Sequence, residues 1–235
     1  MGMHYEFDAI GLVHSPFKEK FGIPRQPGLV PEINAVLELL PPFDRPEAVS
    51  GLQGYSHIWV QFVFHQTIQD QWQPTVRPPR LGGNRRVGVF ASRSPFRPNP
   101  IGLSVVKLDE VRCAAGRVEL AVSGVDMVDG TPVLDVKPYI PYVDSISDAL
   151  SGYASVPPEH PFDVHILPLA EEQLNLRPEA ARLRVLIKSI LKIDPRPAYM
   201  GESQPDRIYG IRLYDFDLRW RVEGNRVEVL ELAPA

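Results

Sequence analysis

The chain has 235 residues, enough for one large domain or for a medium domain and a small one. Hydrophobic residues make up 44% and charged residues 23%, as in an ordinary soluble globular protein, and no apolar stretch is long enough to cross a membrane. The N-terminal residues lack the basic and apolar regions of a signal peptide, so we expect a cytoplasmic protein. Cys113, the single cysteine, excludes an intramolecular disulfide and a metal site built from cysteines.

The charged residues are unevenly distributed along the chain. A net charge of −4 argues weakly against a nucleic-acid partner, but residues 71–108 contain no Asp or Glu. The cationic residues of this segment are Arg77, Arg80, Arg85, Arg86, Arg93, Arg97 and Lys107. Such a segment in an acidic protein is a candidate surface for an anionic ligand, and a solvated loop with scattered arginines is an equally good interpretation.

The first two-thirds of the chain has the pattern of a β protein. Short stretches rich in Val, Leu and Phe are separated by Gly, Pro and Asp-Gly turn signals. The predicted strands are 7–13, 36–40, 57–64, 86–91, 103–111, 117–125 and 132–137. No segment with helical periodicity alternates with them, and the 25 prolines suit long, stiff connections. We therefore expect a β-barrel rather than a parallel βαβ sheet.

A linker-like stretch at 151–161 marks a change of pattern. The elements predicted after it are a strand at 162–167, a helix over 171–191 with a break expected at Pro178, a bent strand at 207–220 and its hairpin partner at 226–232. The sequence thus predicts a mainly β protein, with a barrel domain over 1–150 and a small α+β domain over 160–235.

Residues 92–104 form the most unusual segment, in which three prolines alternate with Phe, Arg and Asn. The prolines favour an extended, stiff loop that presents Arg93, Arg97 and Asn99 in fixed directions. A guanidinium group suits a carboxylate or a phosphate, and the Asn99 amide suits an adenine edge. The alternative is a rigid connector with its arginines in solvent, but stiffness combined with polar side chains favours a site.

A second segment, residues 124–139, contains a tight Asp-Gly turn followed by a predicted strand. Asp135, Lys137 and Tyr139 are expected on one face of this strand. Asp135 and Lys137 could simply pair with each other. Alternatively, the carboxylate could hold an ammonium or a ribose, and the backbone of the turn could meet an adenine.

The remaining candidates are a loop at 24–28 and a strand end at Phe64 and His65. A lone histidine more often makes a structural hydrogen bond than takes part in catalysis, so a hydrolase built on His57, His65 and Asp135 is kept only as an alternative. The chain has no dinucleotide-binding glycine motif, P-loop, zinc-protease motif or serine-hydrolase motif. Its six histidines form no metal-ligand cluster in sequence.

Several of these segments coincide with the motifs of one protein family. The motifs are Pro24-Arg25-Gln26-Pro27-Gly28, Phe64-His65-Gln66, residues 93–104 around Arg97-Pro98-Asn99-Pro100-Ile101-Gly102, and residues 129–139. In this order they closely resemble the TsaA-like, or TrmO, family. The segment 194–199 is similar to that of the bacterial long form, so the resemblance covers nearly the whole chain.

The resemblance implies a tRNA (adenine-N6)-methyltransferase that uses S-adenosylmethionine. The implied substrate is adenosine 37 in the anticodon loop of a threonine-accepting tRNA, already carrying a threonylcarbamoyl group. Family members are similar in having a β-barrel methyltransferase domain and in acting as homodimers. The implied S-adenosylmethionine-binding residues are Arg25, Gln26, Pro27, Phe64, His65, Arg93, Leu103, Asp126, Met127, Val128 and Asp129.

Residue chemistry agrees with this implication and extends it. Methyl transfer to nitrogen is an in-line displacement that needs no covalent nucleophile, and the sequence offers no credible one. Asn99 and Asp135 are predicted as catalytic residues that assist at the adenine N6. The predicted tRNA-binding residues are Arg97, Lys137, Tyr139, Arg196 and Tyr199. A non-catalytic tRNA-binding module remains the other alternative.

Overall fold

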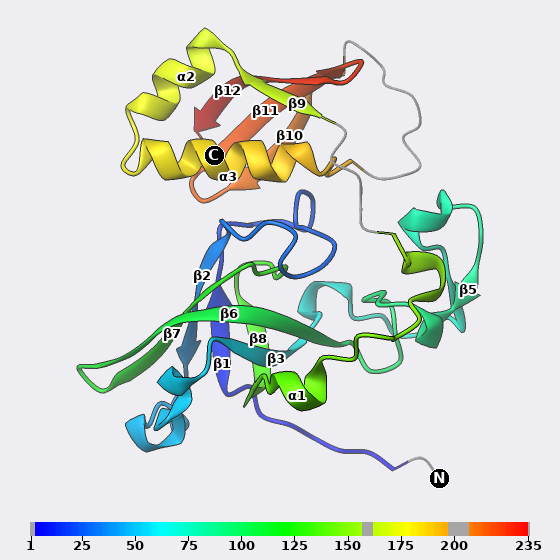
Figure 1. The fold of residues 1–235 in the computed structure, drawn as a ribbon, viewed down its shortest axis with the longest axis vertical. Helices are drawn as coiled ribbons and strands as arrows, with labels where there is room; N and C mark the ends of the chain where they lie inside the picture. The colour runs from blue at the N-terminus through cyan, green and yellow to red at the C-terminus, as the bar shows by residue number, and fades with distance from the viewer. Residues whose placement is uncertain (1–2, 157–161, 197–206, 235) are drawn as a thin grey trace.

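The structure, a computed structural model, describes residues 3–156, 162–196 and 207–234 (Figure 1). Its larger part is a closed barrel with the strand order β1-β2-β7-β6-β3-β8, in which neighbouring strands are antiparallel. The strands are β1 (Gly11–His14), β2 (Asn34–Leu39), β3 (His57–Val63), β6 (Ile101–Ala114), β7 (Arg117–Ser123) and β8 (Thr131–Pro138). The prediction of a mainly β protein built on a barrel is confirmed.

Alternation of apolar and polar side chains explains why these strands close around a core. In β3, Ile58, Val60 and Phe62 are buried, whereas the residues between them are partly exposed. β2 and β7 show the same two-residue period. Because successive side chains of a strand point to opposite faces, one face of each strand fills the barrel.

The connections contain short helices and a two-stranded ribbon. They are η1 (Pro46–Val49), η2 (Leu52–Gly54), η3 (His65–Thr67), β4 (Thr75–Val76), η4 (Pro79–Leu81), β5 (Val87–Gly88), η5 (Val89–Ala91), α1 (Pro141–Asp144) and η6 (Gly152–Ala154). The predicted strand 86–91 is wrong in extent, because β4 offers only two residues for pairing and the chain then turns into η5. None of the described helices is long and apolar enough to cross a membrane.

The C-terminal part is an α+β unit, with its helices packed on a four-stranded sheet (Figure 1). Its elements are β9 (Asp163–Ile166), α2 (Pro168–Asn175), α3 (Ala180–Lys192), β10 (Tyr209–Leu213), β11 (Phe216–Glu223) and β12 (Arg226–Pro234). The sheet order is β10-β11-β12-β9, and only β9 runs parallel to its neighbour among the described pairs. The predicted α+β composition is confirmed.

Two predictions for this unit, the break in its helix and the bent strand at 207–220, can be compared with the structure. The predicted helix is interrupted between α2 and α3, as expected. The proline at 178 has no backbone N–H to donate, and Glu179 has a φ of 58°. The prediction of a single bent strand over 207–220 is wrong. A turn at Tyr214, with a φ of 50°, divides it into β10 and β11, which pair with each other.

The loop between β1 and β2 connects the barrel with the C-terminal unit (Figure 1). Phe17 in this loop is fully buried and forms an isolated β-bridge with Leu213 of β10. The Tyr214 N–H donates to the Pro16 carbonyl at 2.8 Å. The loop is therefore held against the C-terminal sheet by backbone pairing as well as by apolar packing.

Candidate functional site

A cavity of about 470 Å³ opens at the end of the barrel where β3 ends and where β6 and β8 begin. Its walls come from the β1–β2 loop (residues 23–27), the segment after β3 (residues 64–67), the proline-rich loop (residues 92–104) and the turn before β8 (residues 126–128). The volume lies within the range of small-molecule sites, roughly 300–1,000 Å³. Four segments far apart in sequence thus converge on one small-ligand site.

Phe62 and Gly102 shape the apolar wall of the cavity. They are paired across β3 and β6, and a Cβ atom added at Gly102 would lie 2.3 Å from the Phe62 ring. The Phe62 ring in turn meets the Phe64 ring edge-on, at a centroid distance of 5.1 Å. Gly102 is therefore required for space: the aromatic pair occupies the volume that any side chain there would need.

Asp126 is the only acidic residue among the described residues that line this cavity. Burial raises the pKa of its carboxyl group from 3.8 to about 6. The Ser104 hydroxyl, which donates to Oδ1 at 2.6 Å, and the positive charge of Arg93 oppose this increase. The carboxylate is thus poorly solvated and positioned to meet a cationic ligand group.

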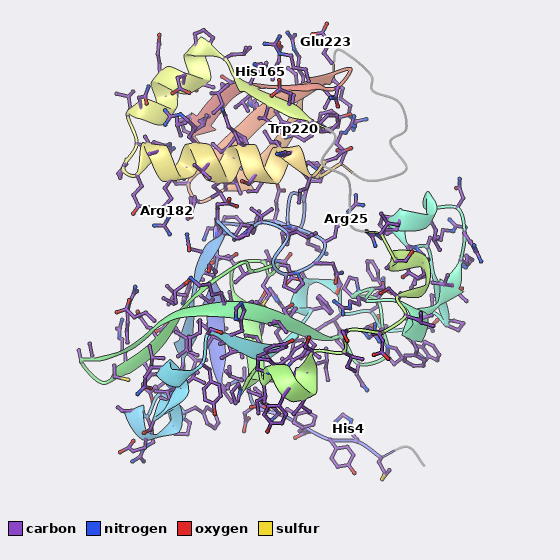
Figure 2. All side chains as sticks on the ribbon, in the orientation of Figure 1. His4, Arg25, His165, Arg182, Trp220 and Glu223 are labelled. Atoms are coloured by element: carbon purple, nitrogen blue, oxygen red, sulfur yellow. The ribbon has the colours of Figure 1, made fainter. Side chains whose placement is uncertain are left out.

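Arginine side chains surround the same cavity. The Arg93 guanidinium donates to the Gln26 side-chain oxygen at 2.5 Å, and Arg25 donates to the Arg196 carbonyl at 2.8 Å. Arg25 lies between the barrel and the C-terminal unit (Figure 2). Neither Arg25 nor Arg93 forms an ion pair with an acidic side chain in the part of the chain that the structure describes. Both therefore keep donor capacity for an anionic group.

The proline-rich loop is stiffened by its own hydrogen bonds. The Arg97 guanidinium donates to the carbonyls of Ser92 and Ser94, at 3.0 and 3.3 Å, while its side chain also lines the cavity. Asn99 is exposed and does not line the cavity; its carbonyl accepts the Ile101 N–H at 2.7 Å. The loop thus brings Arg93 and Arg97 to the site and leaves Asn99 outside it.

Most of the residues implied for the cofactor meet in one place. Those lining the cavity are Arg25, Gln26, Pro27, Phe64, His65, Arg93, Leu103, Asp126, Met127 and Val128. Asp129 is not among them. Its carboxylate pairs with Lys18 at 2.6 Å and accepts the Ser15 N–H at 3.0 Å, so it fixes the β1–β2 loop to the turn before β8.

Asp135, Lys137 and Tyr139 do not line the cavity. Asp135 pairs with Lys137, and it lines a separate cavity of about 670 Å³ at the opposite end of the barrel. A register shift between β3 and β8 carries the pairing from Val133 directly to Asp135, which removes Asp135 from the face that alternation would give it. The Tyr139 ring packs against that of Trp59, at 5.9 Å between centroids.

The side chains of the hydrolase alternative do not converge. His57 begins β3 and His65 follows its end, so eight residues of extended chain separate them by roughly 25 Å. His65 and Asp135 line different cavities. The geometry therefore gives no support to a histidine-based hydrolase.

Arg196 has a different setting from the one expected for a tRNA-contacting residue. Its side chain is only 12% exposed, pairs with Asp194 through two hydrogen bonds of 2.8 and 2.9 Å, and lies over the Phe162 ring at 5.1 Å. The hydrogen bond with Asp194 raises the pKa of Arg196 further. Tyr199, the other predicted contact in this region, lies outside the described residues.

Several lining residues were not among the predicted site residues, although some of them lie within the motif segments 93–104 and 129–139. They include Lys20, Phe62, Gly102, Ser104 and Thr131. Ser104 and Gly102 share a face of β6 with each other, and a two-residue period alone identifies that face. Only the pairing of β3 with β6 shows that this face meets Phe62 at the end of the barrel.

Fold and site together define a class of protein: a β-barrel with a small-ligand cavity that combines one carboxylate with several cationic side chains, beside an arginine-rich surface loop. The chain belongs to the TrmO family. The family model of the tRNA-methyltransferase O N-terminal domain matches residues 12–145, and that of the TrmO C-terminal domain matches residues 159–235. The family resemblance predicted from the motifs is confirmed, and the chain is a methyltransferase of this family.

Known relatives extend over the whole chain. It is 48% identical over 231 residues to the tRNA (adenine(37)-N6)-methyltransferase of Escherichia coli K12, covering 98% of both chains. It is 47% identical over 234 residues to a putative S-adenosylmethionine-dependent methyltransferase of Pseudomonas aeruginosa, covering 98% of this chain and 99% of the relative. A crystal structure of TrmO from Pseudomonas aeruginosa is similar, with a TM-score of 0.80, 40% identity, and coverage of 98% and 99%.

Proposed function

We propose that this protein transfers a methyl group from S-adenosylmethionine to N6 of adenosine 37 in tRNA. The observation that carries the proposal is the cavity at the barrel end, which brings the partly buried Asp126 carboxylate and Arg93 together beside an exposed arginine-rich loop. The substrate is the adenosine that carries a threonylcarbamoyl group in a threonine-accepting tRNA. Relatives named as adenine-37 N6-methyltransferases support the position of the methylated base.

The methyl donor is S-adenosylmethionine, and the cavity residues fit its chemistry. The donor has a cationic sulfonium, an ammonium and a carboxylate, and its remaining surface is largely that of a purine nucleoside. Asp126 suits the cationic groups, and Arg93 suits the carboxylate. Phe64, Leu103 and Met127 offer apolar surface for the rest. When bound, this donor supplies an electrophilic methyl group.

The contribution of the chain is orientation and the exclusion of water. Transfer to nitrogen is an in-line displacement, whose rate depends strongly on how closely the reacting atoms are aligned. The Phe62 and Phe64 rings form an apolar wall, and the hydrogen bond from Ser104 fixes the direction of the Asp126 carboxylate. A carbamoyl substituent makes the N6 proton more acidic, so the site can work without a strong base.

The tRNA contacts the arginine-rich segment beside the cavity. Arg77, Arg80, Arg85 and Arg86 are exposed, and none of them pairs with an acidic side chain within the residues that the structure describes. Unpaired cations suit the phosphates of an RNA loop. The exposed aromatic side chains of this surface suit stacking on unpaired bases; they are Trp72, Phe90 and Phe96.

The enzyme works in the cytoplasm as a homodimer. The segment that starts at α1 exposes large apolar side chains: Tyr142 is 89% exposed, Ile146 67% and Leu150 98%. Such a concentration of exposed apolar side chains is typical of a surface that a partner covers. This apolar segment, residues 142–150, is therefore the surface we assign to the second copy.

Methyl transfer to tRNA tests the proposed function directly. The protein is incubated with S-adenosylmethionine labelled in its methyl group and with tRNA that does or does not carry threonylcarbamoyl at adenosine 37. We expect transfer to the modified tRNA only. Transfer to neither tRNA would contradict the activity, and equal transfer to both would contradict the proposed substrate.

A variant of Arg93 tests the position of the site. Arg93→Ala is expected to reduce transfer at least tenfold, because the donor loses its guanidinium partner, while the melting temperature stays near that of the parent. Arg112→Ala is the matched control, since Arg112 pairs with Glu110 at the far end of β6. An Arg93 variant as active as this control would show that the cavity is not the donor site.

A further inference from the structure

The β1–β2 loop lies between the C-terminal sheet and the donor cavity. On the C-terminal side, the Lys18 N–H donates to the Arg212 carbonyl, and the Arg212 N–H donates to the Glu19 carboxylate at 2.9 Å. Further along the loop, Arg25 donates to the Arg196 carbonyl at 2.8 Å. The loop is thus attached to the C-terminal unit near its start, at residues 18 and 19, and near its middle, at Arg25.

The loop packs tightly against the C-terminal sheet at Gly22. Its φ is +92°, and a Cβ atom added there would lie 2.6 Å from Cγ2 of Ile211, a fully buried residue of β10. Phe21 and Ile23, on either side of Gly22, pack against the same apolar core. The absence of a side chain therefore allows the loop backbone to rest directly on the C-terminal core.

The opposite side of the same loop forms the cavity wall. Lys20, Arg25 and Gln26 line the cavity, and Gln26 accepts the hydrogen bond from Arg93. The Lys20 ammonium donates to the carbonyl of Gln66 at 2.6 Å, and Gln66 belongs to the part of the cavity wall that follows β3. A displacement of the loop would move these groups together.

We propose that the C-terminal sheet is a positioning element for the donor site: contact between Ile211 and Gly22, with the hydrogen bond from Arg25 to the Arg196 carbonyl, sets the place of the cavity wall. Ile211 and Arg196 are positioning residues, since neither lines the cavity. The ion pair with Asp194 and the contact with the Phe162 ring hold Arg196 so that its carbonyl faces Arg25. The proposal rests on the donor site assigned above.

A wedge between loop and sheet provides the test. In Gly22→Ala, the added methyl group collides with Ile211, and the loop has to shift away from the sheet. We expect the Kd for S-adenosylmethionine, measured by calorimetry on the full chain, to rise at least fivefold. Gly51→Ala is the matched control, because Gly51 has a φ of +86° with nothing within 4 Å of an added Cβ atom. It places an alanine at a similar positive φ without a collision and should change the Kd less than twofold.

A double variant separates positioning from general loss of structure. Ile211→Ala removes the atoms that the new methyl group would strike, so Gly22→Ala with Ile211→Ala should bind the donor within twofold of Ile211→Ala alone. A double variant as weak as Gly22→Ala would overturn the proposal. So would a folded Gly22→Ala variant with the affinity of the parent.

If Gly22→Ala does not fold, Asp194→Ala tests whether the C-terminal sheet positions the cavity wall. Loss of the ion pair frees Arg196, and we expect the donor Kd to rise about threefold; Asp163→Ala, which removes a surface ion pair with His165, is its control. An unchanged Kd in a folded Asp194→Ala variant would overturn the proposal.

Hydrogen exchange gives a readout that does not depend on the donor. Amides of the non-proline residues in 20–27 should exchange faster in Gly22→Ala and Asp194→Ala than in the parent, and unchanged exchange in both would overturn the positioning role. If the parent binds no S-adenosylmethionine, the proposed function fails, whereas exchange still decides whether the sheet holds the loop.

Discussion

Among single residues, the carboxylate of Asp126 determines how the site should respond to pH. Its pKa is raised to about 6 by burial, so it is largely ionised only above that pH. A cationic donor needs the ionised form. We expect the affinity for S-adenosylmethionine to fall about tenfold per pH unit well below pH 6 and to level off above it.

Calorimetry between pH 5 and 8 checks this expectation. Asp126→Asn should bind the donor weakly and without the pH dependence, whereas Asp163→Asn, a change on the C-terminal sheet, should keep the profile of the parent. A profile that is the same in Asp126→Asn and in the parent would assign the titration to another group.

The same pKa shift has a consequence for stability. Between pH 3.8 and about 6 the folded state holds more protons on Asp126 than the unfolded state does, so this group makes the protein less stable as the pH rises through that window. Relative to the parent, Asp126→Asn should therefore gain in melting temperature on going from pH 4 to pH 7. A constant difference between the two proteins would contradict the assigned shift.

Among elements, the pairing of β3 with β6 creates the apolar wall. Because Phe62 faces Gly102 and its ring fills the space of a side chain there, Gly102→Ala should push the ring into the cavity. We expect at least a tenfold weaker donor affinity, measured by calorimetry. Gly88→Ala, where nothing lies within 4 Å of an added Cβ atom, is the control. Parent-like donor binding by Gly102→Ala would show that the ring does not limit the cavity.

The elements also show where prediction from sequence succeeded and failed. Alternating burial in β3 and β7 is a local property, and the predicted strands there match the structure within two residues. The ribbon β4–β5 and the turn at Tyr214 depend on which segment is available for pairing, so their extents were predicted wrongly. Asp135 was expected at the site because a register shift cannot be read from one strand alone.

For the whole molecule, the exposed apolar segment 142–150 predicts that two copies of the chain form a dimer. Leu150→Asp places a charge on the most exposed apolar side chain of the surface we assign to the second copy, so it should convert a dimer to a monomer in light scattering. Leu176→Asp is the control, because Leu176 is also exposed, at 87%, but follows α2 in the C-terminal unit. A monomeric parent, or a dimeric Leu150→Asp variant, would contradict this surface.

The sequence by itself determined the barrel class, the α+β unit, the family and the stiff arginine-bearing loop, since these depend on periodicity, proline content and contiguous motifs. Only the tertiary structure decided which of the motif residues meet. It brought Arg25, Arg93 and Asp126 to one cavity, and it placed Asp135 at the other end of the barrel and Arg196 in a partly buried ion pair. The physical reason is that strand register and the docking of the C-terminal sheet are set by pairing between distant segments.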